Sequence, residues 1–185
     1  MPAPDDRLRL LTLLRDRALM RESVVLASGK RSSYYFDARQ VLLDPEGAEL
    51  AGRLGYETLR PHDLQAIGGL TSGADPLVCA ISAAAWGDGR RWNGFFVRKE
   101  AKKHGLQNWI EGPFIEEGTS VAIVDDTLTS GGSVIDAVKK ARQAGGVVVA
   151  ALVVIDREEG GREAIEAELG GAPLHALFGA SELLG

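Results

Sequence analysis

The chain has 185 residues, of which 45% are hydrophobic, and this composition suits a single globular domain with a sizeable core. Its 21 basic and 26 acidic side chains give a net charge of −5, which argues against nucleic acid as a partner, because binding a phosphate backbone needs a clustered cationic surface. No apolar stretch approaches the roughly 20 residues that span a membrane. The N-terminus also lacks the profile of a signal peptide, so we expect a soluble, cytoplasmic protein without a membrane partner.

The single cysteine excludes an intramolecular disulfide framework. Cys79 lies within the apolar residues 77–81. A thiol in such surroundings is usually a small core residue rather than a nucleophile. We therefore expect Cys79 to be buried.

The first predicted elements lie in the N-terminal forty residues. Residues 8–19 have the periodicity of an amphipathic helix, with arginines on its polar face. Strands are expected at residues 24–26 and 34–38, on either side of a turn at Gly29.

Helices and strands alternate in the rest of the chain. Asp44 and Pro45 predict a helix that runs to about Arg60, because aspartate caps a helix N-terminus and proline fits its first position. Such alternation argues for a parallel sheet covered on both faces. The segment 99–118 lacks periodicity and is rich in charge and glycine, so we expect a long functional loop there. Strands are expected near residues 66–69, 94–98, 120–124, 147–155 and 174–178, and helices near residues 76–86, 133–143 and 162–169.

The most informative segment is residues 121–133. Four apolar residues predict a buried strand, Asp125 and Asp126 follow, and a helical pattern starts at Ser133 after a run of hydroxyl and glycine residues. The glycines let backbone N–H groups turn toward an anion, and a helix N-terminus favours negative charge. The two carboxylates could hold vicinal hydroxyls or a Mg²⁺-bound ligand. A ribose 5-phosphate satisfies both halves, with its phosphate in the loop and its ribose over the carboxylates.

Two other interpretations explain this segment less well. Strand–turn–helix connections often carry Asp, Thr, Ser and Gly simply as turn and cap residues. Two of each of these residues within positions 125–133 favour the ligand-binding interpretation over that one. Common nucleotide sites fit poorly, because the chain has neither G-x-x-x-x-G-K-[ST] nor a G-x-G-x-x-G after a predicted strand.

The segment 121–133 resembles the phosphoribosyl-pyrophosphate (PRPP) motif of type I phosphoribosyltransferases, in which two acidic residues precede a T-x-x-G-x-[ST]-like loop. Residues 97–105, V-R-K-E-A-K-K-H-G, resemble the R-K-x-x-K-x-H-G loop of the orotate phosphoribosyltransferases. Weaker matches lie at residues 28–37 and 156–161. The matches follow the family's order from about residue 20 to residue 161, which chance rarely produces.

The resemblance implies an α/β, type I phosphoribosyltransferase fold: a central, mostly parallel sheet flanked by helices, with a small N-terminal hood and a long mobile loop. We expect one phosphoribosyltransferase domain over residues 1–185, with about residues 1–40 contributing the hood. The implied reaction transfers the 5-phosphoribosyl group from PRPP to orotate, giving orotidine 5′-monophosphate and pyrophosphate in de novo pyrimidine (UMP) biosynthesis. The family's loop closes over the neighbouring subunit's active site, so a homodimer with shared sites is implied.

The bond between ribose C1 and pyrophosphate breaks in this reaction, so catalysis must come from positioning and from stabilising the leaving group with Mg²⁺ and cationic side chains. Without the resemblance, the basic residues 98–104 would be a solvated surface loop. The resemblance makes Lys102, His104, Asp125 and Asp126 the catalytic candidates, while Lys103 falls at an unmatched position. The implied cofactor is Mg²⁺, held through PRPP, and the two aspartates are the protein groups that could bind it. The implied PRPP-binding residues are Thr71, Ser72, Arg98, Lys99, Lys102, His104, Asp125, Asp126, Thr127, Leu128, Thr129, Ser130, Gly131, Gly132 and Ser133.

The segment 68–76 follows a predicted strand and precedes a predicted helix. Its backbone N–H groups could bind pyrophosphate, and relatives often carry a non-proline cis peptide bond here, which is a rare feature in proteins. Thr71 and Ser72 occupy the matching positions. A plain turn and helix cap is the alternative interpretation.

Arg157 is the leading candidate for binding the base. A guanidinium offers two parallel donors, which match the 6-carboxylate of orotate. The resemblance implies that Arg157 and Thr129 contact orotate, and that Tyr35 and Phe36 flank its ring. Without it, Arg157 would be an ordinary surface residue and the two aromatics would be core residues of a strand.

Two positions depart from the family pattern. Ala27 stands where some relatives have a lysine that reaches the reaction centre, and Trp109 puts a bulky ring where smaller polar residues are usual. Both leave room for a related base. A phosphoribosyltransferase for another base therefore remains an alternative, as does a catalytically inactive, PRPP-sensing regulator.

Overall fold

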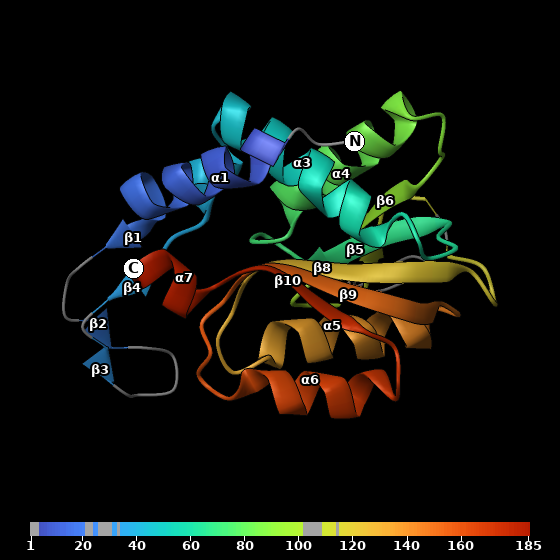
Figure 1. Cartoon of the computed structure of the whole chain (residues 1–185). Coiled ribbons are helices and arrows are strands. Elements are labelled where there is room, and N and C mark those ends of the chain that lie inside the picture. The colour runs from blue at the N-terminus through green and yellow to red at the C-terminus, as the bar shows by residue number, and fades with distance from the viewer. Residues whose placement is uncertain (1–3, 21–23, 26–30, 33, 102–108, 114) are drawn as a thin grey trace.

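The computed structural model describes residues 4–20, 24–25, 31–32, 34–101, 109–113 and 115–185. A six-stranded sheet forms its centre, in the strand order β10-β9-β8-β5-β6-β7 (Figure 1). The strands are parallel except for β7, which pairs antiparallel with β6 at the edge. The bounds of the strands are β5 (Ala66–Leu70), β6 (Asn93–Val97), β7 (Ile110–Glu111), β8 (Ser120–Leu128), β9 (Val147–Asp156) and β10 (Leu174–Gly179).

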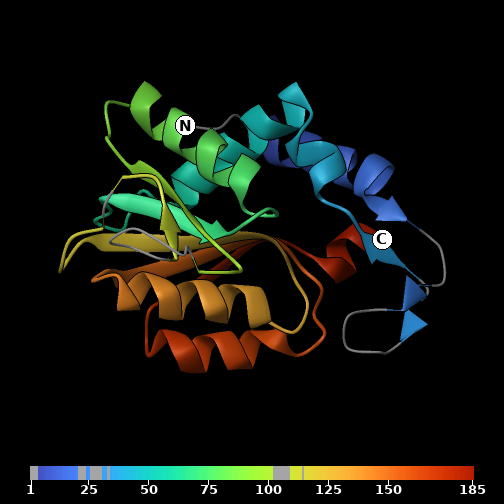
Figure 2. The same ribbon diagram turned by 180° about the vertical axis from the view of Figure 1, so that it is seen from behind.

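Helices cover both faces of this sheet, as the alternating pattern predicted. Figures 1 and 2 show one group of helices on one face of the sheet and a second group on the other. The first group is α1 (Pro4–Leu13), α3 (Pro45–Leu59) and α4 (Asp75–Gly87), and the second is α5 (Gly132–Gln143) and α6 (Gly161–Leu169).

The hydrophobic core lies in two layers, one on each side of the sheet. Ala122 and Val124 of β8 belong to the layer beneath α1, α3 and α4, whereas Val121 and Ile123 belong to the layer beneath α5 and α6. All four side chains are fully buried. Successive side chains of a strand point to opposite faces, so an unbroken apolar run supplies both layers.

The N-terminal region forms two small sheets beyond the end of the central one (Figure 1). The predicted helix at residues 8–19 begins earlier, at Pro4, and its last turn is a π-helix, η1 (Leu14–Ala18). The two predicted strands do not pair with each other: β2 (Val24–Val25) pairs with β3 (Arg31–Ser32), and β4 (Tyr35–Phe36) pairs with β1 (Leu19–Met20). Gly29 lies outside the described residues. The remaining short helices are α2 (Arg39–Leu42) and α7 (Ala180–Leu184).

The start of α3 is as predicted. The Asp44 carboxylate accepts hydrogen bonds from the backbone N–H groups of Glu46 and Gly47, at 3.1 and 3.2 Å, and Pro45 occupies the first position. The helix ends at Leu59, one residue before the predicted boundary. Helix caps are local interactions, which explains why the sequence predicts this element well.

Two predicted boundaries near the motif segments were wrong. Strand β8 does not end at Val124 but continues to Leu128, because β9 offers a backbone partner as far as Asp156. The predicted loop 99–118 contains β7, which pairs with Phe96 and Val97 of β6. In both cases a neighbouring strand decides the outcome, and hydrophobic periodicity does not reveal such a neighbour.

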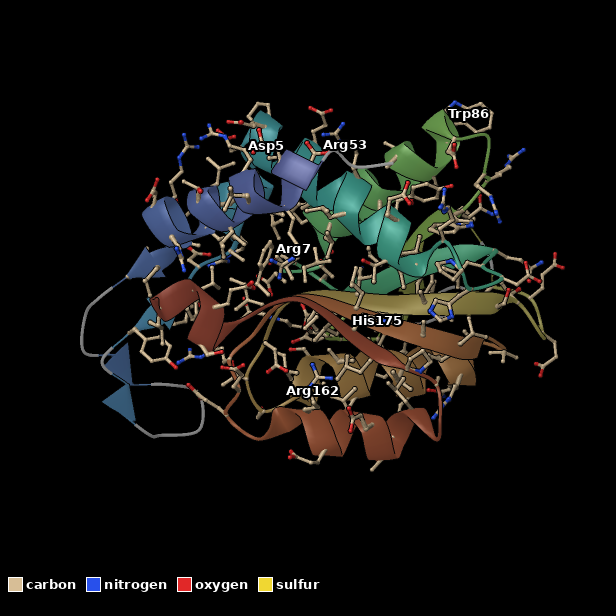
Figure 3. All side chains as sticks on the ribbon, viewed as in Figure 1. Asp5, Arg7, Arg53, Trp86, Arg162 and His175 are labelled. Atoms are coloured by element: carbon tan, nitrogen blue, oxygen red, sulfur yellow. The ribbon has the colours of Figure 1, made fainter. Side chains whose placement is uncertain are left out.

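The prediction that Cys79 is buried was also wrong, because this residue is exposed. Helix α4 buries Leu77, Val78 and Ile81, and Cys79 lies on its other side. Trp86, near the end of the same helix, is 70% exposed and projects outward in Figure 3. The apolar composition of α4 therefore continues around its outer face and does not mark the core. None of the helices among the described residues is long and apolar enough to cross a membrane.

Candidate active site

The adjacent parallel strands β5 and β8 end at the same edge of the sheet, where α/β folds commonly bind ligands. A cavity of about 220 Å³ lies there. It brings together eight of the residues predicted from the sequence, which come from four separate segments of the chain. Its lining is Tyr35, Arg39, Leu70, Thr71, Ser72, Gly73, Lys99, Asp125, Asp126, Thr127 and Ser133.

A larger hollow, of about 570 Å³, lies between α3 and α4. Alanines such as Ala80 and Ala84 line much of it, together with Tyr56 and Arg53. It contains none of the predicted site residues. We assign the chemistry to the smaller cavity, because that cavity gathers the carboxylates, hydroxyls and cations that a phosphorylated sugar requires.

Asp125 and Asp126 are the most unusual groups of the site. Asp125 is only 5% exposed, and its Oδ1 accepts a hydrogen bond from the backbone N–H of Asp126 at 3.0 Å. Burial, and then the negative charge of Asp126, raises the pKa of Asp125 well above its ordinary value. Burial also raises the pKa of Asp126. Two desolvated carboxylates side by side are costly, and a bound cation or hydroxyl donors from a ligand would stabilise them.

The Thr71–Ser72 peptide bond is cis, as the resemblance implied. Thr71 is held at both ends: its N–H donates to the carbonyl of Val97 at 2.8 Å, and its Oγ1 donates to Asp75 Oδ2 at 2.6 Å. Asp75 is the first residue of α4. The turn therefore connects β5, β6 and α4, and it places Thr71 and Ser72 along the cavity wall.

The segment after β8 leads directly into α5. Gly131 has a φ of 84°, a left-handed conformation that favours glycine, and it is the N-cap residue of α5. The helix N-terminus is thus available to an anion beside the carboxylates. Thr127 Oγ1 is buried without a hydrogen-bond partner among the described residues, and Thr127 lines the cavity.

Some of the other predicted residues of this segment line the cavity and others do not. Ser133 lines the cavity, but Thr129, Ser130, Gly131 and Gly132 are not among its lining residues. The Leu128 side chain is 1% exposed and belongs to the core, so only its backbone could contact a ligand.

The predicted cationic loop is only partly within the described residues. Lys99 lines the cavity. Arg98 does not, and its Nη1 pairs with Glu111 Oε1 at 2.6 Å while its Nε donates to the carbonyl of Glu100 at 3.0 Å. Lys102, Lys103 and His104 lie outside the described residues, as does Ala27.

Arg157 is not the ordinary surface residue that the alternative interpretation predicted. It is 2% exposed, and its Nε and Nη2 donate to Glu159 Oε1 at 3.0 and 2.7 Å. Its guanidinium lies 5.2 Å from the centre of the Tyr34 ring, and that ring packs against Phe36. Phe36 itself is buried, whereas Tyr35 points to the cavity. Arg157 therefore lies on the Tyr34 side of β4, outside the cavity lining.

Sequence reasoning missed Arg39, which also lines the cavity. Its Nε donates to Asp37 Oδ1 at 2.8 Å. Burial opposes ionisation of Asp37, but hydrogen bonds from Arg39 and Gln40 outweigh it and lower the pKa of that carboxyl. Arg39 begins α2, a single turn too short to give a periodic signal. Its closeness in sequence to Tyr35 is the only signal that could have found it.

No family model matches the chain. An orotate phosphoribosyltransferase of Rhodopseudomonas palustris (strain BisB18) is 44% identical over 181 residues, covering 96% of both sequences. A crystal structure of Mycobacterium tuberculosis orotate phosphoribosyltransferase with Fe(III) dicitrate is 40% identical and aligns with a TM-score of 0.85 over 96% of this chain and 98% of that one. A structure of the same enzyme with PRPP gives 38% identity and a TM-score of 0.81, over 97% of this chain and 99% of that one. The sequence, the fold and the arrangement of the cavity agree, and the chain belongs to the orotate phosphoribosyltransferase family.

Proposed function

We propose that this chain transfers the 5-phosphoribosyl group of PRPP to orotate at the cavity between Tyr35 and Asp126, releasing orotidine 5′-monophosphate and pyrophosphate. This is a step of de novo pyrimidine biosynthesis. The single observation that carries the proposal is the pair of buried Asp125 and half-buried Asp126, which shares one cavity with Lys99 and the cis Thr71–Ser72 turn.

PRPP would bind in this cavity with each of its parts beside a different group of residues. Its 5′-phosphate would lie at the start of α5, where the Gly131 turn and Ser133 offer backbone and hydroxyl donors. Its ribose hydroxyls would face the two aspartates. Its pyrophosphate would lie between Lys99 and the Thr71–Ser72 turn, so that a cation stabilises the charge that builds up as the bond to C1 breaks.

The residues of the cavity fit a Mg²⁺ cofactor. Mg²⁺ is usually held by one or two carboxylates together with substrate phosphates, rather than by a cage of protein ligands. Asp125 and Asp126 are such carboxylates, and their desolvation favours a nearby cation. When bound with PRPP, Mg²⁺ would neutralise charge on the pyrophosphate. The protein's own part is to orient the ribose and to exclude water from the reacting carbon.

Orotate would enter from the side of β4, where the two small N-terminal sheets would form a hood over it. Tyr35 offers a ring to stack on the base, and Thr129 follows the end of β8. Arg157 would bind the 6-carboxylate, in competition with Glu159, which already accepts from the same guanidinium. The Tyr34 ring beside it keeps that guanidinium oriented.

The protein would act in the cytoplasm as a homodimer with shared sites. Lys102 and His104 would be contributed to the pyrophosphate of the neighbouring subunit. Two neighbouring residues support this sharing of the site between subunits. Of the two, Lys99 lines the cavity of its own subunit, whereas Arg98 pairs with Glu111 instead.

The direct test is an assay of orotate depletion with PRPP and Mg²⁺, run beside adenine, hypoxanthine, guanine and uracil. We expect turnover of orotate alone, and its loss when Mg²⁺ is chelated. Turnover of another base with orotate inert would identify a phosphoribosyltransferase of different specificity. PRPP binding without turnover of any base would instead favour the PRPP-sensing regulator.

A further inference from the structure

Lys140 of α5 is a buried cation with no role in the proposed reaction. Its side chain is 11% exposed, whereas the side chain of its neighbour Lys139 is 63% exposed. Burying an ammonium is costly unless charged and polar partners replace the lost water. The partners of Lys140 therefore show what the residue holds in place.

Three groups surround the Lys140 ammonium, which has three N–H donors. It donates to Asp136 Oδ2 at 2.7 Å and to the carbonyl oxygen of Arg98 at 3.0 Å. It also lies 4.1 Å from the centre of the Trp109 ring, within the range of a cation–π interaction. Trp109 is the bulky residue that departs from the family pattern, and this contact gives it a structural partner.

The same groups fix the end of β6 from two sides. The N–H of Arg98 donates to the carbonyl of Trp109 at 2.8 Å, which continues the ladder between β6 and β7. The carbonyl of Arg98 is bound by Lys140. This carbonyl belongs to the peptide unit that joins Arg98 to Lys99, and a peptide unit is planar. Holding its oxygen therefore fixes the plane of this peptide unit and restricts the directions that the Lys99 side chain can take.

We propose that Lys140, supported by Trp109, is a positioning residue that aims Lys99 at the pyrophosphate of PRPP. The inference rests on the proposed function, because it assigns Lys99 to the leaving group. Lys99 lines the cavity, whereas Lys140 acts only through the backbone of Arg98. A displacement of about 1 Å at a reacting group can cost up to about 100-fold in rate. Loss of the Lys140 contacts should therefore lower the rate of the reaction.

The experiment compares Lys140→Met with Lys139→Met, two variants that remove the same charge from adjacent positions of α5. We expect Lys140→Met to lower kcat/KM for PRPP by about 10-fold or more, with the KM for orotate within about two-fold of wild type. Lys139→Met should match wild type in both. Lys140→Arg keeps a cation beside Trp109 and should recover part of the activity.

A double-mutant cycle with Lys99→Ala separates positioning from general destabilisation. If Lys140 acts through Lys99, adding Lys140→Met to Lys99→Ala should cost less than about two-fold more in kcat/KM for PRPP. Fully additive losses, or equal activity of the Lys140→Met and Lys139→Met variants, would overturn the inference. Should Lys140→Met fail to fold, Trp109→Leu decides by the same cycle. Wild-type protein that does not turn over orotate would instead refute the proposed function.

Discussion

The carboxylate of Asp126 lies directly against Gly73. A Cβ atom added to this glycine would lie 2.9 Å from Asp126 Oδ1, closer than a real Cβ contact. Gly73 follows the cis Thr71–Ser72 turn, so the absence of a side chain lets that turn approach the carboxylates of β8. The close approach of these two walls of the cavity therefore requires a glycine at position 73.

We expect Gly73→Ala to damage PRPP binding more than stability. The group in the way is the end of a flexible side chain, so Asp126 can move aside, but it then leaves its position toward the ribose. The expected result is a loss of about 10-fold or more in kcat/KM for PRPP, with a small change in Tm. Gly87→Ala is the control, because a Cβ at Gly87 would meet nothing within 4 Å. Equal activity of the two variants would contradict the prediction.

Asp125→Asn should stabilise the free protein and inactivate it. Because the pKa of Asp125 is raised in the folded state, that state binds the proton more tightly than the unfolded state. The free energy of unfolding therefore falls as pH rises through the folded-state pKa, and the variant avoids this loss. We therefore expect the variant to have a higher Tm than wild type at neutral pH.

The pH dependence provides the control for this prediction. The Tm difference between Asp125→Asn and wild type should shrink as pH falls, and it should be smallest below the ordinary value of 3.8, where the wild-type carboxyl is protonated in both states. Orotate turnover should drop by about 100-fold or more, since the ribose loses a charged partner. A variant less stable than wild type at neutral pH would show that burial of the charged Asp125 carboxylate does not destabilise the folded protein.

The sequence predicted the chemistry of this site better than its geometry. Asp125 was found because its type and spacing suit a ribose phosphate, whereas Lys99 and Thr71 came from the resemblance to the family. The three meet because parallel strands end at one edge. The cap at Asp44 was predicted because it depends only on its near neighbours.

The features of the site that the sequence did not predict depend on contacts between distant segments of the chain. Arg39 enters the cavity only because the short α2 places it there. Glu111 draws Arg98 away from the cavity through the pairing of β7 with β6. Lys140 is covered by Trp109, a residue far from it in the sequence. Periodicity and local propensity carry no information on such pairs.

The contact between His62 and His175 predicts a pH-dependent stability. Their Nε2 atoms are 3.1 Å apart, and His175 lies on β10, where Figure 3 labels it. Burial, and then the charges of His62 and Arg162, lowers the pKa of His175 below its ordinary 6.5. The unfolded state therefore binds the proton more tightly, so this stabilisation is complete above pH 6.5 and is lost as pH falls below that value. In His175→Gln the Tm should fall less between pH 7.5 and 5.5 than in wild type, roughly the range over which an ordinary histidine titrates. Parallel Tm curves for the two proteins would refute this assignment.

Arg157→Ala tests the proposed orotate clamp. Loss of a charge-assisted, bidentate contact should lower kcat/KM for orotate by about 100-fold or more, equivalent to a few kcal/mol. PRPP binding should be nearly unchanged, because Arg157 does not line the PRPP cavity. Because Arg157 is buried, Tm is measured in parallel. An unaltered KM and kcat for orotate would show that the clamp lies elsewhere.

Glu159→Gln examines the same clamp from the opposite side. Glu159 accepts from Nε and Nη2 of Arg157, so it competes with any incoming carboxylate. Removing its charge should lower the KM for orotate by a few-fold, roughly the effect of a weakened charged hydrogen bond. Glu163→Gln, in the first turn of the nearby α6, is a matched control, and its KM for orotate should equal that of wild type. A higher KM in Glu159→Gln would mean that Glu159 orients Arg157 for orotate instead of competing with it.

The shared active site can be tested by mixing two inactive proteins. Lys102→Ala should be nearly inactive because the loop donated to the neighbour lacks its cation, and Asp125→Asn with Asp126→Asn should be nearly inactive because its own ribose site is damaged. After subunit exchange, about half of the dimers are mixed, and each mixed dimer has one site with both an intact ribose pocket and an intact donated loop, so activity should return to about a quarter of wild type. If activity does not return although exchange is demonstrated with labelled subunits, Lys102 serves its own subunit and the shared-site proposal is wrong.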